Sequence, residues 1–535
     1  MMKTFFCFSL LSSLSIISAA YNILVLSPVT SPSHSNFFRP VVRELAERGH
    51  YVTYWNGIPP DKSIFSNQTA NNLRVIYSSS LATINNHHKT ISIKDHGSPF
   101  RLLLGIPHRM VSYCTAIYQE PVFHQLMNSS ERYDLIIIEG VFNECVLPLV
   151  GKFQVPFVYM NGLAASPWLL DALGLSLAFD HLPHPTGTNH GDEMNLLQRT
   201  YNTLAGMTIS YFHQWFVMPE VDRLASEMLK LNNEKSVWKI QDEYMGLVIT
   251  NTHFSTNYKF PASPAIIEAG GLHCGPSKPL PEELESFVDS SGDAGFIIVS
   301  FGSILRGADV SDNIRRLFLS TFTQLPQKIL WKWENEMEHK NDSSSIPSNV
   351  KLLPWMPQQD LLGHPKIRLF ITHGGIFSNQ EAVYHGVPLI VLPVYSDQPV
   401  NAQKAQDDGY GIRLDWGDLN EEILLNAIQT ILSNSSYAER AKKVSAIVHD
   451  QKESPLERAI YWIEYVIRHR GAPHLRIASR KLSLYQRCLF DVMLLIFVAT
   501  LLLCYATNFL CRWVHLTLLF QKQGKRLKGS HKKVD

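Results

Sequence analysis

Apolar residues in this chain fall into short continuous runs that alternate with apolar positions at helical spacing, a pattern typical of strands alternating with helices. Near the start, Ile23–Leu26 forms one such run, and residues 37–46 carry apolar positions at helical spacing before Gly49. Another run, Tyr51–Trp55, follows. We therefore predict a strand–helix–strand unit here, with a Ser- and Pro-rich loop over 27–36.

Further runs of strand length divide the chain into two groups. Two lie at 135–138 and 156–159, and the segment 162–242 after them has a helical but irregular pattern. A linker rich in Pro and Gly occupies 275–281, and beyond it strand-like runs alternate with helical patterns at 296–300, 329–331, 351–353, 369–372, 389–392 and 411–414. This order predicts two α/β halves, the second built on a parallel, doubly wound sheet.

Apolar stretches near both ends predict secretion and membrane insertion. Residues 1–20 combine a basic start with an apolar stretch and a small-residue end, the pattern of a cleaved secretory signal. The stretch 489–511 is long enough to cross a bilayer core of ~30 Å, and the tail after it is basic. A buried helix of a soluble domain is the alternative. We expect a single-pass type I protein with its main domains in the lumen.

The last four residues, Lys532-Lys533-Val534-Asp535, resemble the dilysine retrieval signal of endoplasmic-reticulum membrane proteins. This resemblance implies residence in the endoplasmic-reticulum membrane. The alternative is that these lysines only favour a cytoplasmic tail. The predicted organisation is a signal at 1–20, an N-terminal domain at 21–275, a linker at 276–291, a C-terminal domain at 292–455, a returning helical segment at 456–488, a transmembrane helix at 489–511 and a basic cytoplasmic tail at 512–535.

Composition narrows the classes of partner. The 535 residues are too many for one core, and 48 basic residues against 47 acidic ones leave a net charge of +1, which gives no support for a nucleic-acid partner. Of seven cysteines, only Cys114, Cys145 and Cys274 lie in the expected luminal part, so at most one luminal disulfide forms within the chain. Four sequons in polar stretches are open to glycosylation: Asn67, Asn128, Asn341 and Asn434.

Candidate chemistry is concentrated in residues 355–398, WMPQQDLLGHPKIRLFITHGGIFSNQEAVYHGVPLIVLPVYSDQ. An apolar run breaks into His373-Gly374-Gly375, a helical pattern follows, and a further apolar run begins after Pro388. A glycine turn at the start of a helix lets phosphate approach free backbone N–H groups. This spaced string resembles the signature of the UDP-glycosyltransferases, the endoplasmic-reticulum, single-pass UDP-glucuronosyltransferases among them. The resemblance implies a GT-B fold, in which two Rossmann-like domains face a cleft.

The resemblance also implies roles in binding a UDP-sugar donor. Trp355 would stack on the uracil, and Gln358 and Glu381 would serve the base and ribose. His373 and the backbone around Gly375 and Ser378 would hold the diphosphate, with Ser303 near it. Asp397 and Gln398 would hold the sugar hydroxyls.

His34 matches the position of the family's catalytic histidine, and an imidazole is a natural base near neutral pH. Glu139, at the end of a strand, would hold the His34 ring and stabilise its charged form. An ordinary solvated loop histidine is the alternative for His34. Three further histidines, His181, His184 and His190, lie in a stretch that we interpret as a loop rather than a metal site.

The implied reaction is an inverting transfer of a sugar to a hydroxyl of a small lipophilic acceptor, with no metal and no cofactor besides the UDP-sugar co-substrate. Family resemblance favours glucuronate over glucose as the sugar. Two residues depart from the family's pattern: Phe377 stands where Asn is usual, and Lys332 where many members have Arg. Phe377 and Glu139, which stands where the family often has Asp, motivate the alternative of a catalytically weak, membrane-bound partner that binds UDP-sugar or associates with active relatives. A lectin-like surface receptor is a third interpretation, and the oligomeric state, homo- or hetero-oligomer, is left open.

Overall fold

The computed structural model describes residues 20–60, 64–69, 71–82, 99–175, 178–184, 190–229, 236–261, 263–302, 310–334 and 346–530. The predicted signal, apart from Ala20, therefore lies outside the described residues, as do Ser303, Asn341, Lys532 and Lys533. The chain divides into two compact units. One comprises Met1–Ala172 and Leu177–Arg476, and the other comprises Leu173–Ser176 and Ile477–Asp535.

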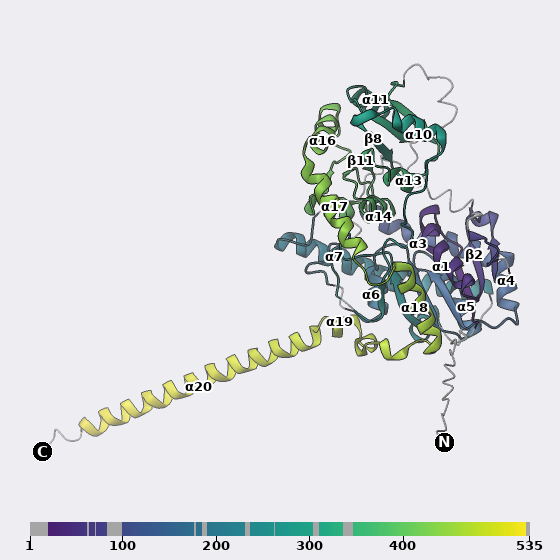
Figure 1. Ribbon diagram of the computed structural model, residues 1–535. Coiled ribbons are helices and arrows are strands. Elements are labelled where there is room, and N and C mark those ends of the chain that lie inside the picture. Colours follow the sequence, from purple (N-terminus) through teal and green to yellow (C-terminus); the bar gives the residue numbers. More distant parts are fainter. Residues whose placement is uncertain are drawn as a thin grey trace, which may run out of the picture. The chain divides into compact units, whose positions relative to one another are not determined.

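The first half of the larger unit is built on a seven-stranded parallel sheet in the order β3-β2-β1-β4-β5-β6-β7 (Figure 1). Its strands are β1 (Asn22–Ser27), β2 (Tyr51–Asn56), β3 (Leu73–Tyr77), β4 (Leu135–Glu139), β5 (Phe157–Asn161), β6 (Met245–Thr250) and β7 (Ile266–Glu268). The helices are α1 (Pro32–Glu47), α3 (Pro99–Gln119), α4 (Pro121–Asn128), α5 (Leu147–Phe153), α6 (Pro167–Ala172), α7 (Leu196–Phe212), α8 (Met218–Leu229) and α9 (Val237–Tyr244), with a 3₁₀ turn η3 (Glu144–Val146) and a π-helical turn η4 (His213–Val217).

A six-stranded parallel sheet, ordered β10-β9-β8-β11-β12-β13, forms the second half. Its strands are β8 (Phe296–Ser300), β9 (Lys328–Lys332), β10 (Val350–Leu353), β11 (Ile367–Thr372), β12 (Leu389–Val391) and β13 (Gly411–Arg413). Around it lie α10 (Glu282–Asp289), η5 (Gly292–Ala294), α11 (Asp312–Thr323), α13 (Gln358–Leu362), α14 (Ile376–His385), α15 (Gln398–Asp407), α16 (Glu421–Ser433) and α17 (Ser435–His449). The prediction of parallel strands separated by helices is confirmed.

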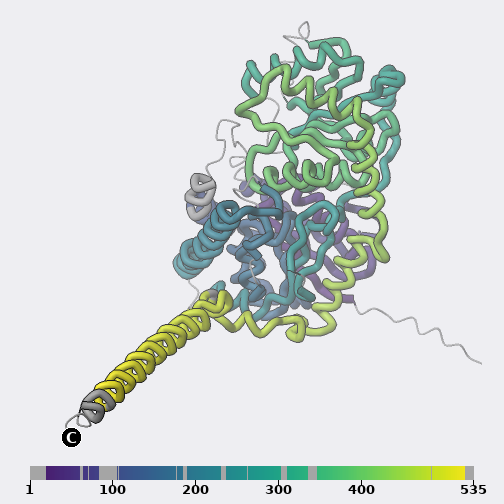
Figure 2. Tube along the Cα trace, turned by 90° about the vertical axis from the view of Figure 1, so that its left-hand side faces the viewer, coloured from purple at the N-terminus to yellow at the C-terminus, as the bar shows by residue number. Residues whose placement is uncertain are grey.

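After α17 the chain returns to the first half as α18 (Pro455–Arg468), a crossing that Figures 1 and 2 both show. Apolar residues of α18, Ile460 and Ile463 among them, are fully buried in one core with Phe37 and Val41 of α1. A hydroxyl cap and Pro455 fix the start of this helix, because the side chains of Ser454 and Glu457 form a capping box there. Burial of α18 therefore ties the end of the second half to the first.

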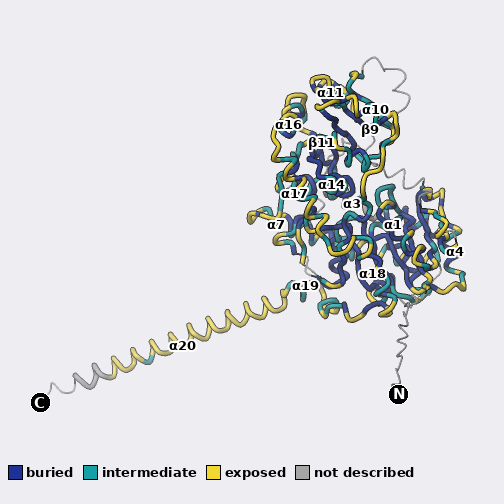
Figure 3. Tube along the Cα trace, viewed as in Figure 1, coloured by how far each residue is buried: buried dark blue, intermediate teal, exposed yellow. Residues whose placement is uncertain are grey.

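The carboxyl ends of the strands set the position of the site. In the first sheet the order of connections reverses between β1 and β4, which pair directly, and in the second sheet it reverses between β8 and β11. Ligands of doubly wound sheets bind beyond the carboxyl ends at such reversals. Buried residues dominate both sheets, as Figure 3 shows in dark blue. Each sheet therefore acts as a rigid base for the loops that follow its strands.

The structure corrects the predicted loop over 27–36 and identifies the disulfide among the luminal cysteines. The segment 27–36 is not all loop, because α1 begins at Pro32 and includes His34 in its first turn. Ser31 is the reason, since its side chain accepts a hydrogen bond from His34 N at 3.3 Å and proline at the first helical position favours the start. The cysteine pair is Cys114–Cys145, which links α3 to η3, and Cys274 is free.

The smaller unit contains η9 (Ala478–Lys481), α19 (Leu484–Arg487) and α20 (Phe490–Ser530), and η8 (Pro473–Leu475) lies at the end of the larger one. Within α20, Phe490–Gly524 is long and apolar enough to cross a membrane, and Figure 3 colours most of this helix as exposed. The helix continues beyond residue 511 into the basic segment and ends at Ser530.

Candidate functional site

His34 and Glu139 form a direct pair at the carboxyl ends of β1 and β4. His34 Nδ1 lies 3.2 Å from Glu139 Oε1, and the Glu139 side chain is fully buried. Ser31 holds the first turn of α1, and Gly162 leaves room for the ring, because a Cβ there would lie 3.0 Å from His34 Nδ1. With Nδ1 turned to the carboxylate, Nε2 is the ring nitrogen left to face a ligand.

The electrostatic surroundings favour a charged His34 ring. Burial by itself lowers the pKa of His34, but the charge of Glu139, its hydrogen bond and the charge of Asp397 together raise the pKa above its ordinary value. A carboxylate that accepts from one imidazole nitrogen fixes the tautomer and stabilises the imidazolium that forms when the other nitrogen takes a proton. The arrangement is therefore that of an oriented general base.

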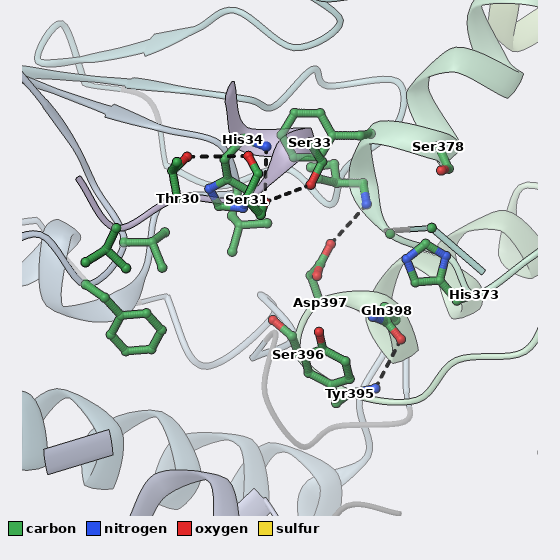
Figure 4. Close-up of a pocket in the computed structure, with 18 of the residues that line it drawn as sticks. Thr30, Ser31, Ser33, His34, His373, Ser378, Tyr395, Ser396, Asp397 and Gln398 are labelled. Carbon is green, nitrogen blue, oxygen red and sulfur yellow. Dashed lines mark hydrogen bonds between the residues drawn. The ribbon is translucent and has the colours of Figure 1, made fainter. Parts of the chain in front are cut away.

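A cavity of about 250 Å³, here called the His34 cavity, lies between His34 and the loops of the second half (Figure 4). His373, Gly375, Ser378, Asp397 and Gln398 line it opposite His34. Figure 4 shows Ser31, Ser33 and His34 on one side and Asp397, His373 and Ser378 on the other. Apolar residues complete the wall on the side of the first half: Val29, Val141, Phe142 and Leu163.

His373 follows β11 and sits between two glycines. A Cβ at Gly302 would come within 2.6 Å of His373 Cε1, and one at Gly375 within 2.7 Å of Nε2, so only glycine fits at either position. Burial first, and then the nearby Lys332 charge, lower the pKa of His373 to about 4. Its ring is therefore neutral near pH 7, and it can meet a phosphate oxygen as an uncharged N–H donor.

Asp397 and Gln398 stand where β12 leads into α15. Asp397 Oδ2 accepts from the backbone N–H of Ile376, the first residue of α14, at 3.2 Å and from Asn401 Nδ2 at 2.7 Å. Burial raises the pKa of Asp397 in spite of these bonds. Gln398 Oε1 accepts from the N–H groups of Val394 and Tyr395, which leaves its amide nitrogen, without a partner among the described residues, as the donor toward the cavity.

A second cavity of about 440 Å³, here called the Trp355 cavity, shares four lining residues with the His34 cavity: Ser33, Gly302, Phe377 and Ser378. Trp355 is 66% exposed on its wall, with Lys332 Nζ 5.2 Å from the centre of its ring. An exposed indole face of this kind suits stacking on a planar base. Lys332 Nζ also donates to Gly302 O and pairs with Glu334.

Gln358 and Glu381 meet in the Trp355 cavity. Gln358 Nε2 donates to Glu381 Oε2 at 2.6 Å and to Ser378 Oγ at 3.1 Å. Burial raises the pKa of Glu381 to about 7, against the effect of the Gln358 bond and with the help of the Asp360 charge. The structure thus brings together every described donor-site candidate. Ser303 lies outside the described residues, directly after Gly302.

Phe377 lies between the two cavities, in the first turn of α14. Its ring centre is 5.6 Å from that of His34 and 5.0 Å from that of His273, and the residue is only 8% exposed. Asn379, two residues later on α14, carries the same amide group as the Asn that is usual at 377. Its Oδ1 instead accepts from Tyr410 Oη at 3.4 Å and the residue is 2% exposed, so Asn379 faces the core.

Other candidate residues lie apart from the two cavities. Asn67, Asn128 and Asn434 are exposed, as glycan attachment requires. Among the described residues, the ligand atoms of Glu285, Asp289 and His364 lie close enough together to suit a metal, and those of His181, His184 and His190 do not form such a group.

Sequence reasoning did not single out Arg109, Tyr113 or Tyr395, which line the His34 cavity.

Comparison with solved structures identifies the fold. A glycosyltransferase of calicheamicin, CalG4, matches with a TM-score of 0.55 at 19% identity, over 83% of this chain and 98% of that one. LpCGTa, solved in complex with UDP, matches with a TM-score of 0.51 at 18% identity, over 84% of this chain and 100% of that one. These similarities confirm the predicted GT-B fold of two Rossmann-like domains.

Comparison with sequences extends over nearly the whole chain. UDP-glycosyltransferase UGT5 of Dactylopius coccus is 32% identical over 98% of this chain and 100% of its own length. UDP-glucuronosyltransferase 2B19 of Macaca fascicularis is 32% identical over 93% of this chain and 94% of its own. The family model described as UDP-glucoronosyl and UDP-glucosyl transferase matches residues 23–526. With this match, the GT-B fold and the two cavities that meet at Ser378, the chain belongs to the UDP-glycosyltransferase family.

Proposed function

We propose that this protein transfers a glucuronosyl group from UDP-glucuronate to a hydroxyl of a small lipophilic acceptor, in a single inverting displacement with His34 as the base. Membership of the family supports glycosyl transfer from a UDP-sugar. The proposed displacement with His34 as the base rests on one observation: the His34–Glu139 pair faces Asp397 and Gln398 across the His34 cavity.

In the proposed reaction, His34 Nε2 removes the proton of the acceptor hydroxyl as its oxygen attacks the anomeric carbon. The bond from that carbon to the diphosphate oxygen breaks on the opposite face, and UDP leaves with the electron pair. Glu139 stabilises the imidazolium that results. His373 and the N-terminus of α14 stabilise the charge on the departing diphosphate. Asp397 and Gln398 hold the sugar hydroxyls while the bonds change.

An apolar wall beside the base supports a lipophilic acceptor. Val29, Val141, Phe142 and Leu163 line the His34 cavity on the side of the base, beside the hydroxyls of Thr30, Ser31 and Ser33. Aromatic and aliphatic walls of this kind favour small apolar ligands. The acceptor hydroxyl would then be the polar group directed at His34.

The test is UDP release by the purified full-length protein with UDP-glucuronate or UDP-glucose and a panel of lipophilic phenols. Release that depends on a phenol and is faster with UDP-glucuronate supports the proposal. Binding of UDP-sugar without any release would instead support a catalytically weak, membrane-bound partner. Phe377 favours that second candidate, since a phenyl ring at the start of α14 offers no hydrogen bond to phosphate.

The apolar helix α20, long enough to cross a membrane, supports membrane association. We propose residence in the endoplasmic-reticulum membrane with the two sheets in the lumen, supported by the expected signal, the exposed sequons and the dilysine end. Protease added to sealed microsomes should then trim the tail beyond Phe520 and spare the glycosylated domains. Digestion of the domains in intact vesicles would contradict this orientation.

A further inference from the structure

Arg109 places one permanent positive charge on the wall of the His34 cavity. Among the described residues that line this cavity, Arg109 is the only lysine or arginine. It stands on α3 with Tyr113 one turn later, and both side chains line the cavity. Tyr113 packs against Phe142, another lining residue, at 6.0 Å between ring centres. This packing fixes the face of α3 that carries Arg109.

The Arg109 guanidinium lies over its own helix and has no anionic partner there. A Cβ at Gly105 would be 3.4 Å from Arg109 Nη2, so the missing side chain leaves the guanidinium room against the helix backbone. Within the described ranges, no carboxylate lies within ion-pair distance of Arg109, whereas Arg223 of α8 bonds to two glutamates. A half-buried, unpaired guanidinium is a ready site for an anion.

Arg109 lines the His34 cavity together with Tyr395, Asp397 and Gln398. Its charge acts on Tyr395, where it opposes the rise in pKa that burial and Asp397 produce, and it acts in the same way on Tyr113. Tyr395 precedes Asp397 by two residues in the loop after β12. Arg109 therefore shares the His34 cavity with the loop whose Asp397 and Gln398 are the candidates for the sugar hydroxyls.

We propose that Arg109 determines donor specificity by binding the carboxylate of the glucuronosyl group while Asp397 and Gln398 hold its hydroxyls. This inference rests on the proposed function. A guanidinium matches a carboxylate with two parallel N–H donors, whereas the neutral hydroxymethyl of glucose would leave the cation unpaired in the cavity.

Calorimetry on the full-length protein in detergent micelles, without acceptor, tests this assignment. The dissociation constants of UDP, UDP-glucose and UDP-glucuronate are measured for wild type, Arg109→Leu, Arg109→Lys and the control Arg223→Leu, which removes a surface cation of the same domain. Wild type should prefer UDP-glucuronate. Arg109→Leu should reduce that preference over UDP-glucose ~10- to 100-fold and change UDP affinity by less than about twofold. Arg109→Lys should retain part of the preference, and Arg223→Leu all of it.

An unchanged preference in Arg109→Leu would overturn the assignment, as would a wild type that prefers UDP-glucose. A variant that loses only the use of anionic acceptors, with donor preference intact, would also overturn it. Failure of the proposed function gives a different result. If Arg109→Leu loses the donor preference but wild type transfers no sugar, Arg109 keeps its role and the catalytic proposal fails.

Discussion

Replacing Glu139 by Gln should separate the positioning of His34 from the rest of the site. Glu139 is fully buried and its Oε1 lies 3.2 Å from His34 Nδ1, so the substitution keeps the shape and removes the charge. A hydrogen bond to a charged group contributes ~1.5–3 kcal/mol, which corresponds to roughly 10- to 100-fold in rate if it acts on the imidazolium of the transition state. A Gln amide that donates to Nδ1 would also favour the wrong tautomer.

The pKa of His34 predicts the direction in which the pH profile of Glu139→Gln should move. A base must be neutral to act, so kcat/KM should rise as the pH rises through the pKa of His34, which the Glu139 carboxylate raises against the effect of burial. Without that carboxylate the pKa falls. The acidic limb of the profile should therefore move to lower pH in Glu139→Gln, while the plateau falls by the factor given above.

The assay is UDP release at acceptor concentrations well below saturation, which reports kcat/KM, across the pH range in which the protein stays folded. Glu144→Gln is the matched control, because Glu144 Oε1 makes a similar buried bond of 3.0 Å to His213 Nε2 away from the His34 cavity. Its profile should match that of wild type. An acidic limb that does not move in Glu139→Gln, with a plateau within about twofold of wild type, would refute the pairing as a catalytic device.

Three further predictions concern the donor. Phe377→Asn and Phe377→Leu should both lower the melting temperature, since the buried ring is lost, but the Asn variant should bind UDP ~10- to 100-fold more tightly than the Leu variant. Equal affinities would place the phosphates away from residue 377. Trp355→Ala should lose ~1–3 kcal/mol of UDP binding measured by calorimetry, and Trp215→Ala, which removes another exposed indole, should lose none. Because burial raises the pKa of Glu381 to about 7, its carboxylate loses its charge as the pH falls through 7. The affinity for a UDP-sugar, whose diphosphate does not titrate in this range, should therefore fall roughly tenfold from pH 8 to pH 6 and stay flat in Glu381→Gln.

Periodicity and spacing predicted most of the second half of the fold. Its strands are continuous apolar runs separated by glycines and prolines, so each run could be assigned from the sequence. The strand β6 could not be assigned from the sequence, because it follows α9 directly at Met245 without a Gly or Pro to separate helix from strand. The predicted start of α1 was wrong by several residues. Ser31 and Pro32, where the helix begins, belong to a segment whose composition resembles a loop.

The donor candidates could be named from the local sequence, but the residues that lie near them in the folded protein could not. Trp355, His373 and Asp397 come from one stretch with fixed spacing, and so they could be named together. Arg109 belongs to a helix distant in sequence, and only the packing of α3 against α8 and η3 brings it to the same cavity as Asp397. The direction in which Asn379 points depends likewise on Tyr410, a contact that no pattern in the sequence indicates.

The most direct test of the account is the comparison of sugar transfer and UDP binding in wild type and His34→Ala. His34 lies on α1 of the first half, whereas the candidates for uridine and diphosphate lie on the second, so the two readouts should separate. The account predicts a loss of transfer of ~10²- to 10⁴-fold with UDP affinity within about twofold of wild type. Transfer by His34→Ala at a rate within about twofold of wild type would contradict it.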